Sequence, residues 1–203
     1  MDYWGKDDFE AVKKVAESAA SEPEWAAYAE FCKKYEHGLR REAFDALDRF
    51  IVSMSAAPFS ARRRFVSWLS QQADGSAARN RLIPHPLWVR VVEPTLLEWT
   101  LVEPESYEPH VWLGGYEHLQ RAQQLAPEND LVNRKSIAAI LSRVDWHTHE
   151  LPAGYLGVPR EDLAELDQAE SLLPRLSSEN ERTRLAVDIA AQRRLIEEYL
   201  RTR

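Results

Sequence analysis

Apolar residues recur at three- and four-residue intervals through nearly the whole chain, and this spacing most constrains its fold. In segment 7–20, for example, Phe9, Val12, Val15, Ala16 and Ala19 share one stripe of a helix. Only 7 of the 203 residues are glycine, which disfavours a turn-dense β fold. We therefore predict an all-α protein made of antiparallel helix pairs.

One segment, 85–104, leaves the type of secondary structure open. It is apolar and rich in β-branched residues, so a strand is possible there. Its Pro-Leu-Trp start and the run Leu96, Leu97, Trp99 and Leu101 favour helix. Because proline disturbs a helix interior, we expect two short helices with a break before Pro94.

Composition indicates a single folded domain over residues 1–203. Hydrophobic residues make up 44% of the chain and charged residues 29%, as in globular proteins, and no change in composition marks a second domain. Within this domain we distinguish N-terminal helices over 1–105 from repeat-like helices over 106–203. The second part contains a long loop at 147–159.

The charge pattern weighs against nucleic acid as a partner. The net charge is −7, whereas a generic nucleic-acid binder is basic. Segment 61–90 has six arginines and one acidic residue, and segment 91–120 has six acidic residues and no lysine or arginine. We expect these blocks to complement each other across neighbouring helices, or to tune contact with a charged protein partner.

Other sequence features limit the possible chemistry and location. A single cysteine, Cys32, excludes an intrachain disulfide framework and a multi-cysteine metal cluster. No phosphate-binding loop or other catalytic motif is present, so we expect no cofactor. There is neither a signal peptide nor an 18-residue apolar run, which predicts a cytoplasmic protein that does not span a membrane.

Two stretches of the chain echo each other. Leu119, Ala122, Leu125 and Pro127 map onto Leu166, Ala169, Leu172 and Pro174, each 47 residues later. These residues, with the first-helix signature in 112–116, resemble tetratricopeptide repeats, in which a small residue lets paired helices approach and a proline ends the second helix. The resemblance covers about half of the chain and departs from the usual repeat length of about 34 residues. It implies a right-handed helical array, with an irregular helical bundle as the alternative. The chain is also similar to uncharacterised bacterial helical proteins.

The stretch DWHTHE at 145–150 raises the question of a metal site. Asp145, His147 and His149 superficially resemble the D-x-H-x-H of some metal-dependent phosphoesterases, but those motifs follow a buried strand. Here the preceding residues indicate a helix, and residues two apart on a helix point in different directions. We therefore predict no metal, and a helix end that leads into a structural loop. If the helix runs through residue 149, Asp145 and His149 lie four positions apart and can pair.

The function predicted from these features is that of a non-enzymatic, cytoplasmic scaffold or adaptor that binds a protein or peptide in a groove. Two alternatives stay open: a metal-dependent hydrolase using Asp145, His147 and His149, and a small-molecule-binding regulator with a cavity near the loop. Interface anchors are often aromatic residues. The candidate partner-binding residues are Trp112, Tyr116, Trp146, His147, His149 and Tyr155.

Overall fold

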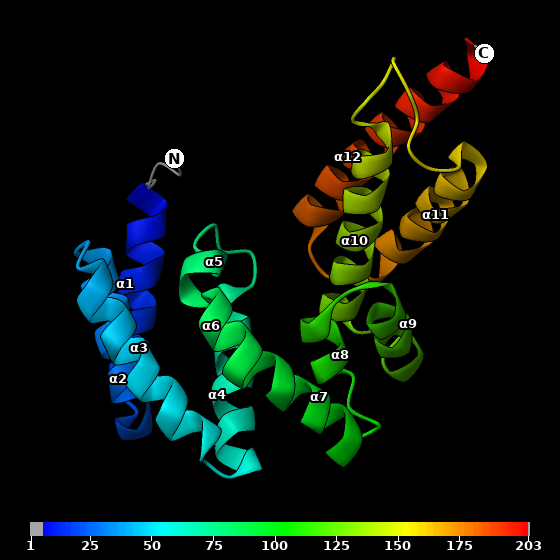
Figure 1. Ribbon diagram of the computed structural model, residues 1–203. Helices are drawn as coiled ribbons and strands as arrows, with labels where there is room; N and C mark the ends of the chain where they lie inside the picture. Colours follow the sequence, from blue (N-terminus) through cyan, green and yellow to red (C-terminus); the bar gives the residue numbers. More distant parts are fainter. Residues whose placement is uncertain (1–5, 203) are drawn as a thin grey trace. The chain divides into compact units, whose positions relative to one another are not determined.

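The computed structural model describes residues 6–202, with side chains from Phe9 onward (Figure 1). Within that range there is no strand, which confirms the all-α prediction. The helices of the first part are α1 Lys6–Ala20, α2 Ala26–Glu36, α3 Arg40–Ser55, α4 Phe59–Ala73, α5 Arg79–Leu82, α6 His85–Leu87 and α7 Glu93–Val102. Those of the second part are α8 Glu108–Leu113, α9 Tyr116–Leu125, α10 Asp130–Thr148, α11 Pro159–Leu172 and α12 Glu179–Arg201.

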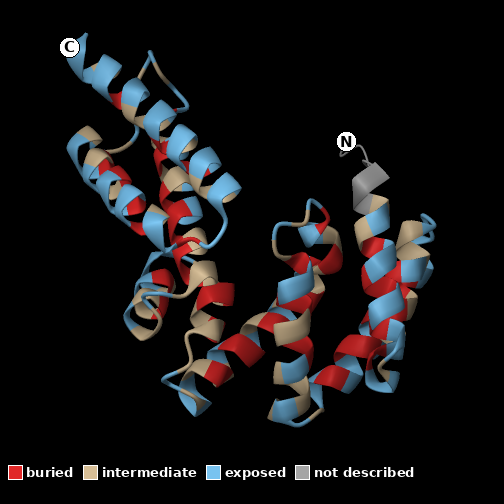
Figure 2. Cartoon of the chain, turned by 180° about the vertical axis from the view of Figure 1, so that it is seen from behind, coloured by how far each residue is buried: buried red, intermediate tan, exposed pale blue. Residues whose placement is uncertain are grey.

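The contacts between residues gather the chain into two compact units, Met1–Pro104 and Glu105–Arg203. The sequence had indicated one domain, with its internal division one residue later, at 105/106. In the longer helices of both units, the buried residues follow one side and the exposed residues the other (Figure 2). No helix in the described part of the chain is both long enough and apolar enough to cross a membrane.

Aromatic side chains form the core of the first unit. Tyr28, Phe31, Phe50 and Phe65 are all less than 2% exposed. The Tyr28 ring lies 5.4 Å from that of Phe50 and 5.2 Å from that of Phe65, and its hydroxyl donates to the carbonyl oxygen of Leu82 at 2.8 Å. Its buried hydroxyl is thus paired, as buried tyrosine hydroxyls usually are.

The segment around Pro94 is continuous, so the break predicted there is wrong. A π-helical turn, Trp88–Val92, joins α6 to α7, and Pro94 lies in the first turn of α7. The amide of Glu93 donates to the carbonyl of Trp88, five residues back. A wider turn before a proline accommodates the ring and the missing N–H without ending the helix. The alternative of a strand is also wrong, because every residue from 85 to 102 is helical.

Within the first unit, residues of the basic segment 61–90 pair with residues of the acidic segment 91–120 across helices, as the sequence predicted. Arg62 of α4 forms an ion pair of 2.8 Å with Glu98 of α7, and Arg63 pairs with Glu103. The Arg63 guanidinium also lies 4.8 Å from the ring centre of Trp99. These contacts hold α4 against α7 and engage the arginines within the protein.

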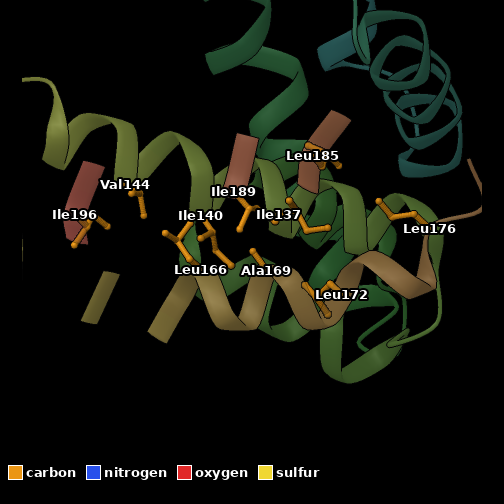
Figure 3. Close-up of a cluster of buried hydrophobic side chains, with 10 residues drawn as sticks. All are labelled: Ile137, Ile140, Val144, Leu166, Ala169, Leu172, Leu176, Leu185, Ile189 and Ile196. Carbon is orange, nitrogen blue, oxygen red and sulfur yellow. The ribbon is translucent and has the colours of Figure 1, made fainter. Parts of the chain in front are cut away.

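Helix α10 is central to the second unit. Ile137, Ile140 and Val144 pack on Leu166 and Ala169 of α11 and on three buried residues of α12 (Figure 3), namely Leu185, Ile189 and Ile196. Ala169 is fully buried where α11 meets this cluster. Its small side chain lets the helices approach closely, which explains the small residue in the echoed pattern.

Contacts between polar residues fix the directions of these helices. Two ion pairs join α10 to α11: Arg143 with Glu165, and His147 with Asp162. From the first pair to the second the residue number rises on α10 and falls on α11, so the two helices are antiparallel. Helix α10 is parallel to α12, because Arg134 contacts Glu181 and Asp145 contacts Gln192. Both of these contacts join residues 47 positions apart.

Candidate functional site

A groove of ≈420 Å³ opens in the second unit between α9, α10 and α11. Its lining combines apolar side chains with amide and hydroxyl groups, one phenol and one guanidinium. The residues are Gly115, Tyr116, Leu119, Gln120, Gln123, Gln124, Ser136, Ala139, Ile140, Arg143 and Gln168. An apolar surface with a few polar groups is typical of a binding site.

Tyr116 and Arg143 contact each other within this lining. The side chain of Tyr116 is 56% exposed, and the Arg143 guanidinium lies 5.2 Å from the centre of its ring. Arg143 also pairs with Glu165, while its buried Nε has no hydrogen-bond partner in the described part of the chain. The guanidinium is thus held in place by a carboxylate and a ring.

The glutamines of the groove are positioned by their neighbours. Gln123 Nε2 donates to Asn133 Oδ1 at 2.9 Å, and the buried Asn133 donates in turn to the carbonyl oxygens of Pro127 and Asn129. Gln120 Nε2 donates to the Tyr116 hydroxyl at 2.7 Å. Ordered amides of this kind can accept from and donate to a ligand backbone without first losing side-chain freedom.

His147 and Tyr155 meet at a buried carboxylate. Asp162 is only 2% exposed, and its two carboxylate oxygens lie 2.9 and 3.0 Å from His147 Nδ1. It also accepts a hydrogen bond from the Tyr155 hydroxyl. Burial and this hydrogen bond raise the pKa of Tyr155 well above its ordinary value. Helix α10 runs to Thr148, so the loop is shorter than 147–159, and the contact ties residues 149–158 back onto α10 and α11.

Trp146 and His149 lie together on the surface, away from that carboxylate. Trp146 is 64% exposed, and its ring stacks on that of His149 with 4.6 Å between ring centres. The pairing of Asp145 with His149, which required the helix to run through residue 149, does not form: His149 Nε2 faces Glu150 at 3.1 Å, and Asp145 accepts from Gln192. Helix α10 ends before His149, so the two side chains do not share a helix face.

Trp112 occupies a different position from the other candidate residues. It is buried, its indole Nε1 has no hydrogen-bond partner among residues 6–202, and the Lys135 ammonium lies 5.5 Å from its ring centre. Among the six candidate residues, only Tyr116 lines the groove.

The histidine stretch does not converge on one point. Asp145 contacts Gln192, and His147 contacts Asp162. His149 contacts the Trp146 carbonyl and Glu150. Across the part of the chain that the structure describes, no three His, Cys, Asp or Glu side chains are grouped as a metal centre would require.

Sequence reasoning missed Arg143, Gln123 and Asp162. Asp162 lies in the first turn of α11, where the helix dipole alone would explain an acidic residue. Its burial beside His147 comes from the antiparallel packing of α10 and α11, which no local signal reveals. Comparison with family models, curated proteins and solved structures gives no match.

Proposed function

We propose that this protein is a cytoplasmic scaffold or adaptor that binds an extended peptide segment of a partner in the α9–α10–α11 groove. The groove itself is the observation that carries the proposal. Its lining has a half-exposed aromatic ring, a fixed guanidinium and ordered amides, and contains no carboxylate, imidazole or thiol to act as a base or nucleophile. This combination favours binding over catalysis.

The arrangement of helices supports a tetratricopeptide-like array in the second unit. The pairs α8–α9 and α10–α11 each finish with a helix that ends near an echoed proline, and α12 follows as the next first helix. The 47-residue offset of the sequence echo equals the offset of the contacts between α10 and α12. In such an array, equivalent residues of successive helix pairs stack, and one helix of each pair contributes to a shared binding surface.

Peptide selection followed by titration calorimetry tests the proposal. A displayed library of short peptides is selected on the whole protein, and Kd is measured for the best binder. Tyr116→Ala should weaken binding by about 2 kcal/mol, as expected for an exposed aromatic anchor. Val187→Ala, on α12 and 63% exposed, is a matched control outside the groove and should leave Kd unchanged.

Two results would count against a peptide groove. Either no peptide is selected, or the selected peptides bind Tyr116→Ala as tightly as the unaltered protein. The volume of ≈420 Å³ also suits a small ligand, since such pockets span roughly 300–1,000 Å³. A small-molecule-binding regulator is therefore the second candidate, and binding of small compounds that is lost in Tyr116→Ala, without peptide binding, would favour it.

A further inference from the structure

Two histidines outside the groove lining face each other in the second unit. His110 of α8 and His118 of α9 place their Nδ1 atoms 3.0 Å apart, with 5.2 Å between ring centres and 40° between ring planes. Both side chains are half-buried, so water can reach them. In the ligand-free protein, one imidazole donates a hydrogen bond to the other.

The backbone holds this pair in place. Helix α8 ends at Leu113 and α9 begins at Tyr116, and between them Gly114 and Gly115 both have positive φ, 68° and 73°. This left-handed conformation is one that glycine adopts without strain. Val111 and Leu119, which adjoin the two histidines in sequence, are buried, so the histidine-bearing helices are anchored on both sides of the turn.

The electrostatic surroundings of His110 favour its unprotonated form. Burial lowers the pKa of His110, and nearby His118 and Arg121 lower it further. The Arg121 guanidinium lies 3.9 Å from the Glu105 carboxylate, which offsets part of its positive charge. Unprotonated imidazoles carry the lone pairs that a metal requires.

We propose that His110 and His118 together bind a divalent transition metal ion through their Nδ1 atoms. Two ligands at 90° to each other, with metal–nitrogen bonds of about 2.1 Å, lie about 3.0 Å apart, which matches the observed separation. Imidazole nitrogens suit Cu²⁺ and Ni²⁺, for which square-planar or tetragonal nitrogen sites are typical. Water fills the remaining positions.

Titration of the tag-free, metal-stripped protein with Ni²⁺ and Cu²⁺ tests this site. We expect one ion per chain, and roughly 100-fold weaker binding in His110→Asn and in His118→Asn, because each variant loses one arm of a chelate. The double variant His147→Asn with His149→Asn is the control, because it removes two histidines that lie close together in the sequence but outside the proposed site. It should bind the metal ion as tightly as the unaltered protein does. Electron paramagnetic resonance of the Cu²⁺ complex should show two equatorial nitrogens.

The spectroscopic measurement keeps the test decisive if an asparagine variant is unstable. A spectrum with fewer than two nitrogen ligands overturns the proposal, as does binding that is lost in the His147/His149 variant and kept in the other two. Absence of binding to the unaltered protein would mean that the pair is a hydrogen bond only. Since the groove lining contains neither histidine, none of these results depends on peptide binding.

Discussion

Replacing Gly157 with alanine should loosen the attachment of the 149–158 loop. A Cβ atom at this position would lie 2.4 Å from Nδ1 and 2.6 Å from Cγ of His147, and 2.9 Å from an Asp162 oxygen. Gly157 does not have a positive φ, so the strain would come from these contacts and not from the backbone. The His147 ring would have to turn away from Asp162.

The expected cost follows from the contact that is lost. A hydrogen bond to a charged group contributes about 1.5–3 kcal/mol to stability, and Asp162 would keep only the Tyr155 hydroxyl of the partners described above. Alanine also lowers the conformational entropy of the unfolded chain, which raises the free energy of unfolding by about 0.4–1 kcal/mol. The net loss is then about 1–2 kcal/mol, which lowers Tm by roughly 2–8 °C for a chain of this length.

Gly154→Ala is the matched control in the same loop. No atom lies within 4 Å of a Cβ built there, and its φ is not positive. Because both variants share the effect on the unfolded chain, the difference between them, about 1.5–3 kcal/mol, isolates the contact with His147. Urea denaturation followed by circular dichroism at 222 nm measures both free energies of unfolding.

A second comparison tests the mechanism directly. In a His147→Ala background only the 2.9 Å approach to Asp162 remains. Gly157→Ala should therefore cost less there, and a double-mutant cycle measures this coupling. The reasoning is refuted if Gly157→Ala is as stable as Gly154→Ala, or if its cost is the same with and without His147.

Three further outcomes follow from the structure. Asp130 accepts hydrogen bonds from the Ser177 amide and hydroxyl, which lower its pKa. Its stabilising effect is therefore complete above the ordinary carboxyl pKa of about 3.9 and is lost as pH falls through the lowered value. In urea titrations Asp130→Asn should be less stable than the unaltered protein at pH 7, and this difference should shrink as the pH falls below about 3.9. Burial raises the pKa of the Cys32 thiol to about 12, so iodoacetamide at pH 8 should label it only as fast as the protein unfolds, and rapid native labelling, read by mass spectrometry, would contradict its burial. Trp146→Ala should change the free energy of unfolding by less than about 0.5 kcal/mol, because the ring is largely exposed, and a larger loss in the same urea assay would show that its stacking on His149 stabilises the fold.

Helix positions could be predicted well from the sequence, because a helix end depends on a few neighbouring residues. The side chain of Asn129 accepts from the Val132 amide at the start of α10, and Ser178 accepts from Glu181 at the start of α12. The echoed Leu and Ala positions are also buried in α9 and α11, apart from the half-buried Leu125. The π-helical turn at Trp88–Val92 escaped prediction because proline can be accommodated by a wider turn as well as by a break.

The candidate site could be predicted only in part. Tyr116 was found from its aromatic side chain, but its position in a groove depends on Arg143, which is 27 positions away. His147 was found as part of a histidine pair, yet it contacts Asp162 and not His149. The histidines that do face each other, His110 and His118, belong to separate helices joined by a Gly-Gly turn.

The sequence by itself determined that this chain is helical and which side of its long helices is apolar. Those properties arise from hydrogen bonds and side chains within a few residues of each other. Tertiary structure alone decided which polar groups meet: Asp162 with His147, Arg143 with Tyr116, and His110 with His118. Periodicity shows which face of a helix is buried, but the distance between two side chains on different helices depends on how those helices cross and how far each is shifted along its axis.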